Sequence, residues 1–162
     1  MLRAYQAAVM AKSVDERSLA NTLDALGNDK VSTLAVKTLE DWPGDDVNDR
    51  LLALTNDATA RRRHGALETL TTRSSASPNQ RLSGAIKVAV TDLRSDVCDQ
   101  KAAGLAAVAG FIERPEAAPV LKAAGAWKAL YEQDSDVVFA KHRCLDAALM
   151  KRTLAAASVI ER

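Results

Sequence analysis

The sequence contains few aromatic residues, few cysteines and few histidines, and it has no long apolar run. Phe, Trp and Tyr make up only 4% of the 162 residues, although 48% of the residues are hydrophobic. A core built mainly from Ala and Leu suits close helix–helix packing and gives a β-sheet little to bury. No apolar stretch approaches the roughly 18 residues that a transmembrane helix needs, so we expect no membrane span.

The two cysteines, Cys98 and Cys144, stand too far apart for a CxxC pair, and both fall in segments with helical periodicity. We therefore expect reduced, buried thiols in a cytoplasmic protein. A disulfide between equivalent faces of two stacked repeats is the alternative. Residues 1–13 carry Arg3 and Lys12 but no acid, a pattern also found in organelle presequences. A first helix that covers one end of the fold is the favoured interpretation.

Residues suited to catalysis or metal binding are scarce. His64 and His142 are the only histidines, and no Cys or carboxylate stands at the helical spacing that would complete a set of three or four metal ligands. His142 and Cys144 would point to different sides of a helix, which excludes a nucleophile–base pair. Phosphate-binding glycine loops and the common hydrolase motifs are also missing. We expect no catalytic residue, no metal and no cofactor.

The charges balance overall but are unevenly distributed. Lys and Arg number 22 and Asp and Glu 21, so no global field attracts nucleic acid or an anionic membrane. Acids dominate the chain before residue 57, at Asp15, Glu16, Asp24, Asp29, Glu40, Asp41, Asp45, Asp46 and Asp49. The strongest basic cluster is Arg61-Arg62-Arg63. Consecutive residues point around a helix, so we interpret the three arginines as a solvated face; binding of nucleic acid is the alternative.

The spacing of apolar residues predicts an all-α chain. The only β-like run, Val88 to Val90, lies inside a helical pattern. Residues 72–80, which are rich in Ser and include Pro78, are predicted to form a loop. Gly125 is predicted to break a helix. Helices are expected at 2–12, 13–26, 29–41, 45–54, 57–70, 82–93, 96–112, 114–124, 127–133 and 136–160.

Two stretches about forty residues apart share one pattern. Ser83 to Val90 is followed by Leu93-Arg94-Ser95-Asp96-Val97 and a long helix. On that helix Val97, Leu105, Val108 and Ile112 are predicted to form an apolar stripe, with Lys101 as its polar exception. Ala124 to Leu130 is followed by Asp134-Ser135-Asp136-Val137 and a second long helix that reaches Leu149. Helix–turn–helix units with this period are typical of α-solenoids.

One such unit runs from Arg114 to Leu130 and continues through Asp134-Ser135-Asp136-Val137. It contains, in order, a short helix, a glycine, a second helix, an acidic turn and a long third helix. This order resembles the armadillo repeat. The resemblance is clearest over residues 78–149 and looser over 45–77. It implies a right-handed α-solenoid of about four armadillo/HEAT-like repeats. That solenoid would be one domain, 1–162, with HEAT-like capping helices at 1–44, armadillo-like repeats at 45–149 and a C-terminal cap at 150–162.

Armadillo adaptors hold a protein partner on a concave face of third helices. The resemblance therefore implies a non-catalytic scaffold or adaptor. The asparagine ladder with which such adaptors bind extended peptides is absent here, because alanines and an arginine occupy the matching positions. An armadillo-type Hsp70 co-chaperone, which grips a globular domain instead of a peptide, is an alternative that explains this difference. The implied partner contacts are Arg62, Thr69, Gln100, Ala103, Ala107, Arg143 and Ala147.

A second resemblance is narrower. The stretch from Asp92 to Val97 is similar to part of the CLASP-type TOG domains, which contact tubulin through the turns between their helices. The equivalent contacts here would be Asn56, Arg94 and Ser135. A HEAT-like DNA-binding protein or glycosylase is a further alternative.

The two tryptophans are candidate anchors for a partner, because aromatic side chains are often binding hot spots. Trp127 takes the place of Ile86 in the preceding repeat, so we expect it in the core. For Trp42, which precedes Pro43-Gly44, the sequence leaves exposure open.

Overall fold

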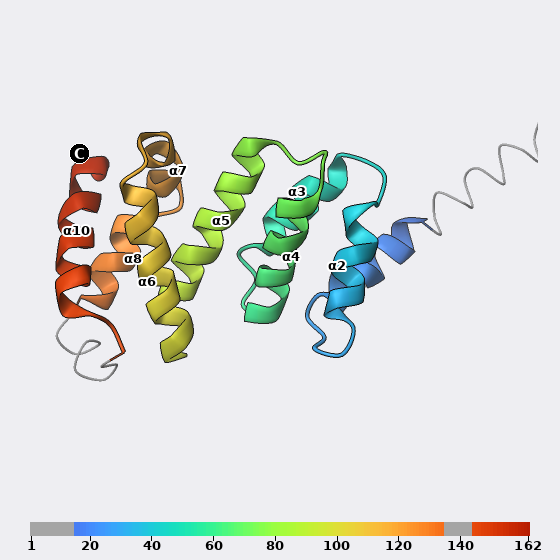
Figure 1. The fold of residues 1–162 in the computed structure, drawn as a ribbon, viewed down its shortest axis with the longest axis horizontal. Coiled ribbons are helices and arrows are strands. Elements are labelled where there is room, and N and C mark those ends of the chain that lie inside the picture. Colours follow the sequence, from blue (N-terminus) through green and yellow to red (C-terminus); the bar gives the residue numbers. More distant parts are fainter. Residues whose placement is uncertain (1–14, 135–143) are drawn as a thin grey trace, which may run out of the picture. The chain divides into compact units, whose positions relative to one another are not determined.

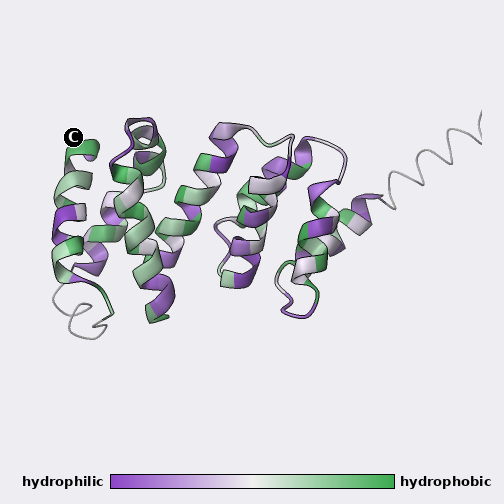
Figure 2. Cartoon of the chain, viewed as in Figure 1, coloured by the Kyte–Doolittle hydropathy of each residue, from purple (hydrophilic) through white to green (hydrophobic). Residues whose placement is uncertain are grey.

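The computed structural model describes residues 15–134 and 144–162, and these residues form helices and connecting turns without a β-strand (Figure 1). The all-α prediction is confirmed for this part of the chain. The chain divides into two compact units, residues 1–76 and 77–162. Figure 2 shows hydrophobic and hydrophilic residues in alternating bands along the helices, as expected of amphipathic helices that bury one face. The stacking of solenoid repeats stays a prediction.

Unit 1 contains a helical segment at 15–25, α2 (Ser32–Glu40), α3 (Asp46–Leu54) and α4 (Ala60–Thr72). Helix α4 packs against both α2 and α3. Periodic apolar residues on these helices form the core, as their spacing predicted. Its buried members are Leu19, Leu23, Leu26, Ala35, Val36, Leu39, Val47, Leu51, Ala66, Leu70 and Ala76.

Unit 2 contains α5 (Pro78–Leu93), α6 (Cys98–Ile112), a 3-10 turn (Pro115–Ala117), α7 (Ala118–Ala123), α8 (Ala126–Gln133) and α10 (Ala147–Glu161). Helices α5 and α6 form a hairpin whose backbones approach most closely at Gly104. A Cβ atom at this position would lie 2.3 Å from the Leu93 nitrogen and 2.7 Å from the Ala89 oxygen. Only glycine therefore permits this crossing.

The apolar stripe predicted on α6 is largely confirmed. Lys101, Leu105 and Val108 are buried, while Val97, just before the helix, is 53% exposed. Trp127 is partly buried against the core of unit 2, as predicted, and stacks on Tyr131 with ring centroids 5.4 Å apart.

The predicted loop over 72–80 is wrong from Ser77 onward, because α5 already begins at Pro78. The hydroxyl of Ser77 accepts a hydrogen bond from the Gln80 N–H (3.1 Å), and the Ser77 N–H donates to the Gln80 side chain (3.0 Å). This capping box satisfies two amide donors, and a proline in the first turn loses no helical hydrogen bond.

The long last helix predicted over 136–160 is also wrong within the described residues. The chain turns at Cys144 and Leu145, and α10 begins only at Ala147. Asp146 caps this helix by accepting a hydrogen bond from the Leu149 N–H (2.7 Å). The start of the predicted helix, and the predicted helix 2–12, lie outside the described residues.

The prediction for the two cysteines also needs correction. Cys98 and Cys144 form a disulfide, with their Cα atoms 5.4 Å apart, so the expectation of reduced thiols is wrong. Cys98 begins α6 and is exposed, while Cys144 lies in the turn before α10 and not inside a helix. The bond depends on a turn that brings residue 144 back to α6, and apolar periodicity does not encode that turn.

Candidate partner-binding cleft

A cleft of about 400 Å³ opens in unit 1 beside Trp42. Three segments that are separate in sequence supply its walls: the first turn of the 15–25 helix, the turn that follows α2, and the first residue of α3. Apolar side chains form one part of the lining and carboxylates the other. The lining residues are Asp15, Glu16, Leu19, Trp42, Pro43 and Asp46.

The turn that carries Trp42 is held from beneath by Arg73, whose side chain is only 2% exposed. The guanidinium donates through Nη1 to the carbonyl oxygens of Leu39 and Trp42 (3.0 Å to Trp42), and through Nη2 to that of Gly44 (3.0 Å). Gly44 has a φ of +102°, a left-handed conformation that a residue with a Cβ rarely adopts. The Trp-Pro-Gly turn is therefore fixed by both its backbone conformation and its carbonyl partners.

The other edge of the Arg73 guanidinium faces α3 and the end of unit 1. Nε donates to the Asn48 side-chain oxygen (2.6 Å), and Nη2 donates to the Ser75 hydroxyl (3.2 Å). Asn48 is 1% exposed and also donates to Ser75 (3.2 Å). Burial lowers the pKa of Arg73, and the nearby carboxylates of Asp45 and Asp46 oppose this shift. The buried charge thus ties three segments together and sets the position of the aromatic wall.

The lip of the cleft is negative. Arg50 pairs with Glu16 and approaches Asp46 (Nε to Oδ2, 3.9 Å), and its hydrogen bond to Glu16 is the main cause of its raised pKa. Three carboxylates line the cleft, and Arg50 pairs with or approaches two of them, those of Glu16 and Asp46. Residues 15–56 as a whole carry nine acids and four bases. An excess of acids in this part of the chain attracts cations.

An indole wall beside carboxylates is suited to binding a cationic side chain. A guanidinium or ammonium over an aromatic face gains about 0.5–2 kcal/mol, and a carboxylate at the same position adds an ion pair. The exposed carboxylates of Glu16 and Asp46 remain accessible despite Arg50, since their side chains are 59% and 65% exposed. The arrangement therefore offers recognition of a basic group.

The partner-contact residues predicted in unit 1 are tied to their own unit. Arg62 pairs with Asp57 (Nη1 to Oδ2, 3.3 Å) and approaches Asp24 (Nη2 to Oδ1, 3.8 Å). Thr69 is fully buried and donates its hydroxyl to the Gly65 oxygen (2.8 Å). This burial leaves no surface of Thr69 for a partner to touch.

The predicted contacts of unit 2 lie on α6 and at the start of α10. Gln100 accepts a hydrogen bond from the Ser95 hydroxyl (2.8 Å). Ala103 is exposed and Ala107 is partly buried against the core, on one side of α6. Ala147 is exposed at the first position of α10, and Arg143 lies outside the described residues. The cleft beside Trp42 is not lined by any of the described residues among these predicted contacts.

The predicted turn contacts are exposed where the structure describes them. Asn56 and Arg94 both lie at the surface, and Arg94 pairs with Glu132 (Nε to Oε2, 3.1 Å). Ser135 lies outside the described residues.

The interpretation of Arg61-Arg62-Arg63 as a solvated face holds for Arg61, whose side chain is 48% exposed, but is wrong for the buried Arg63. Arg61 pairs with Asp29 (Nε to Oδ1, 3.2 Å), and Arg62 pairs as described above. Arg63 is 2% exposed and donates to the carbonyl oxygens of Asp57 (3.3 Å) and Ala58 (3.1 Å). The prediction that the three side chains diverge is confirmed, but their role is to bind acceptors of unit 1.

Sequence reasoning considered Trp42 as an anchor but missed the carboxylates around it. The signal was present as a Trp-Pro-Gly turn inside the acid-rich part of the chain. What the sequence did not indicate is that Asp15 and Glu16 face that turn, because this proximity depends on how the 15–25 helix packs. Among the described residues, no group of three or more His, Cys, Asp or Glu side chains is arranged to hold a metal ion.

Comparison with known proteins gives no relative from which a function could be transferred. No protein-family model, no curated protein and no solved structure matches the chain. Within residues 15–134 and 144–162, no helix combines the length and the apolar character needed to cross a membrane.

Proposed function

We propose that the chain is a non-catalytic protein-interaction module that binds a basic segment of a partner protein in the cleft beside Trp42. The observation that carries this proposal is the cleft itself. Its aromatic wall is fixed by a buried arginine, and its lip carries three carboxylates. A rigid aromatic anchor reduces the entropy lost on binding, and the acidic lip selects the sign of the ligand's charge.

The size of the cleft is consistent with side chains of a peptide segment. Ligand sites typically enclose roughly 300–1,000 Å³, and about 400 Å³ is available here. We expect an arginine of the partner to lie over the Trp42 ring and to reach the carboxylates, because its planar group both stacks on aromatic rings and binds carboxylates through two parallel hydrogen bonds.

The proposal extends to the architecture predicted from the sequence. The α5–α6 hairpin supports armadillo- or HEAT-like repeats, and the exposed Ala103 and Ala147 are compatible with a second contact surface in unit 2. A scaffold or adaptor would use both surfaces.

The test is a peptide-binding titration of the full chain. Peptides that contain Arg-Arg or Lys-Lys pairs are compared with the same peptides in which Glu replaces each base, using fluorescence anisotropy. We expect binding of the basic peptides only, with an affinity that falls as salt is added. Trp42→Ala should weaken binding by about tenfold, since it removes the cation–π contact and its apolar area.

Two controls separate binding from folding. Trp127→Ala removes the other tryptophan, which lies in unit 2, and should leave peptide affinity unchanged. Asp15→Asn keeps the shape of an exposed side chain and should weaken binding two- to threefold (about 0.4–0.7 kcal/mol) without changing stability. Equal affinity of Trp42→Ala and wild type, or equal binding of acidic and basic peptides, would refute the proposal.

A further inference from the structure

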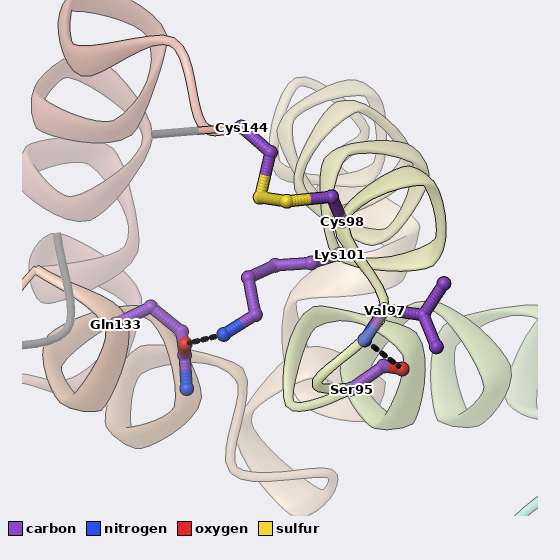
Figure 3. The surroundings of a disulfide bond; sticks show 6 residues. All are labelled: Ser95, Val97, Cys98, Lys101, Gln133 and Cys144. Atoms are coloured by element: carbon purple, nitrogen blue, oxygen red, sulfur yellow. Dashed lines mark hydrogen bonds between the residues drawn. A yellow bond between two sulfur atoms is a disulfide. The ribbon is translucent and has the colours of Figure 1, made fainter. Parts of the chain in front are cut away.

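The Cys98–Cys144 disulfide joins the first residue of α6 to the turn before α10 (Figure 3). The two cysteines are 46 positions apart in the sequence. Cys98 is exposed, whereas Cys144 is partly buried. Exposed disulfides are accessible to thiols and tend to be the labile ones, in contrast to buried disulfides that only stabilise a fold.

Helix α10 packs against α6, α7 and α8, and Leu149, Leu154 and Ile160 add partly buried contacts with the core of unit 2. Of its residues, Met150, Thr153 and Ala157 are buried, and Val159 is 68% exposed. Its far end is held by a hydrogen bond from the Lys122 ammonium to the Glu161 carbonyl oxygen (3.0 Å). At its N-terminal end the disulfide supplies a covalent connection to α6, so this bond contributes strongly to the docking of α10.

Helix α8 is connected to α6 differently, at a position next to the disulfide. The ammonium of Lys101 is turned toward α8 and donates to the Gln133 side chain (2.6 Å), as Figure 3 shows. Lys101 is 2% exposed and Gln133 is 8% exposed. A reductant leaves this hydrogen bond intact. Opening the disulfide therefore acts on α10 and spares the contact between α6 and α8.

We propose that Cys98–Cys144 is a thiol–disulfide exchange site at which a dithiol reductant releases α10 from α6. One thiolate of the dithiol attacks Cys98 Sγ, which the exposure of Cys98 favours. The S–S bond breaks, its electron pair moves to Cys144 Sγ, and that thiolate takes a proton from water. The second thiol of the reductant then displaces Cys98 from the mixed disulfide. Two electrons have passed to the protein, and the reductant leaves as a disulfide.

The size of the effect follows from the length of chain that holds α10 in place. In the oxidised protein only Leu145 and Asp146 separate the cross-link at Cys144 from the start of α10. In the reduced protein this covalent tether is absent, and the same turn is held by noncovalent contacts such as that of Leu145, which is 5% exposed in the core of unit 2. Losing a short tether lowers the effective concentration of α10 beside α6, so we expect its undocked state to become about tenfold more populated on reduction.

The experiment measures thiol content and hydrogen exchange of the full chain, oxidised and treated with millimolar dithiothreitol without denaturant. Alkylation followed by mass spectrometry should count no free thiol before treatment and two after it. Amides of α10 should then exchange about tenfold faster, while those of α4 and of the α5–α6 hairpin keep their rates.

Variants test the site and the chemistry separately. Cys98→Ser/Cys144→Ser should reproduce the reduced exchange pattern and ignore the reductant. Of the single variants, Cys144→Ser, which retains the exposed Cys98, should form a mixed disulfide with oxidised glutathione faster than Cys98→Ser does. Free thiols in the oxidised protein, a bond that opens only in denaturant, or reduction without faster exchange in α10 would each overturn the proposal. None of these results bears on the cleft in unit 1.

Discussion

Replacing Arg73 with methionine should destabilise unit 1 and weaken peptide binding, although Arg73 does not line the cleft. Methionine keeps an unbranched apolar stem and removes the guanidinium donors. Within unit 1 those donors satisfy the carbonyl oxygens of Leu39, Trp42 and Gly44 and the side-chain oxygen of Asn48. After the substitution these acceptors lose the guanidinium, although the Leu39 oxygen keeps the hydrogen bond that it accepts from the Trp42 N–H (3.2 Å).

The magnitude follows from which of these acceptors are buried. The hydrogen bonds to Leu39 and to Asn48 are buried, and those to Trp42 and Gly44 are partly buried. Each fully buried acceptor without a partner costs about 1–3 kcal/mol. Removing the charge recovers part of the desolvation penalty of the guanidinium. The full cost therefore falls on the Asn48 oxygen, and we expect a loss of about 2 kcal/mol in the free energy of unfolding.

The assay is urea unfolding followed by the fluorescence of Trp42 in a Trp127→Phe background, where Trp42 is the only tryptophan. Arg73→Lys is the matched control, because an ammonium keeps the charge but cannot span acceptors on both sides. It should fall between wild type and Arg73→Met in stability and in peptide affinity. Full stability of Arg73→Lys, or a loss below about 0.5 kcal/mol in Arg73→Met, would show that the hydrogen bonds do not hold the turn.

Two further predictions concern α6. In thermal unfolding, Gly104→Ala should destabilise unit 2 by about 3 kcal/mol or more, because the new methyl group would meet the backbone of α5. The matched control is Gly110→Ala: a Cβ at position 110 would meet open space, so this substitution should stabilise unit 2 by about 0.5–1 kcal/mol. Burial lowers the pKa of Lys101 below its ordinary 10.5, with Asp96 opposing the shift. Between the lowered pKa and 10.5 the unfolded chain binds more protons at Lys101 than the folded chain does, so stability should rise with pH in this window. The urea midpoint should therefore increase with pH in the wild type and change less in Lys101→Met. Equal slopes of midpoint against pH in the two proteins would contradict the lowered pKa of Lys101.

Helical periodicity predicted most of the described helices because its signal is local. The apolar residues of α3 recur at the predicted positions, and Gly125 ends a helix with a φ of +68°, as its place in the sequence indicated. The start of α5 was missed although its signal is also local. Ser-rich composition outweighed the Ser77-x-x-Gln80 capping signature, and Pro78 was interpreted as a helix breaker when it stands at the one turn that tolerates it.

The long-range connections that fix the candidate sites were harder to predict: the contacts of Arg73 were missed, and the Cys98–Cys144 disulfide was only the alternative to reduced thiols. Arg73 reaches residues 25 to 34 positions away, and Cys98 pairs across 46 positions. Such pairings depend on how helices return to one another, which no local pattern specifies. The sequence did mark Lys101 as the polar exception on an apolar stripe, and this residue does make a buried long-range hydrogen bond. A polar residue on a predicted core face is therefore a useful pointer to such a connection.

The two units stabilise small Ala- and Leu-rich cores by different means, and this difference separates their responses to the environment. Units of this size bury limited apolar surface and benefit from an added cross-connection. Unit 1 uses a guanidinium that stays charged at any physiological pH and has no cysteine, so reductant cannot act on it. Unit 2 uses a disulfide that a dithiol can open. It follows that peptide affinity at the cleft beside Trp42 should be the same in oxidised and reduced protein, even while the exchange rates of α10 change.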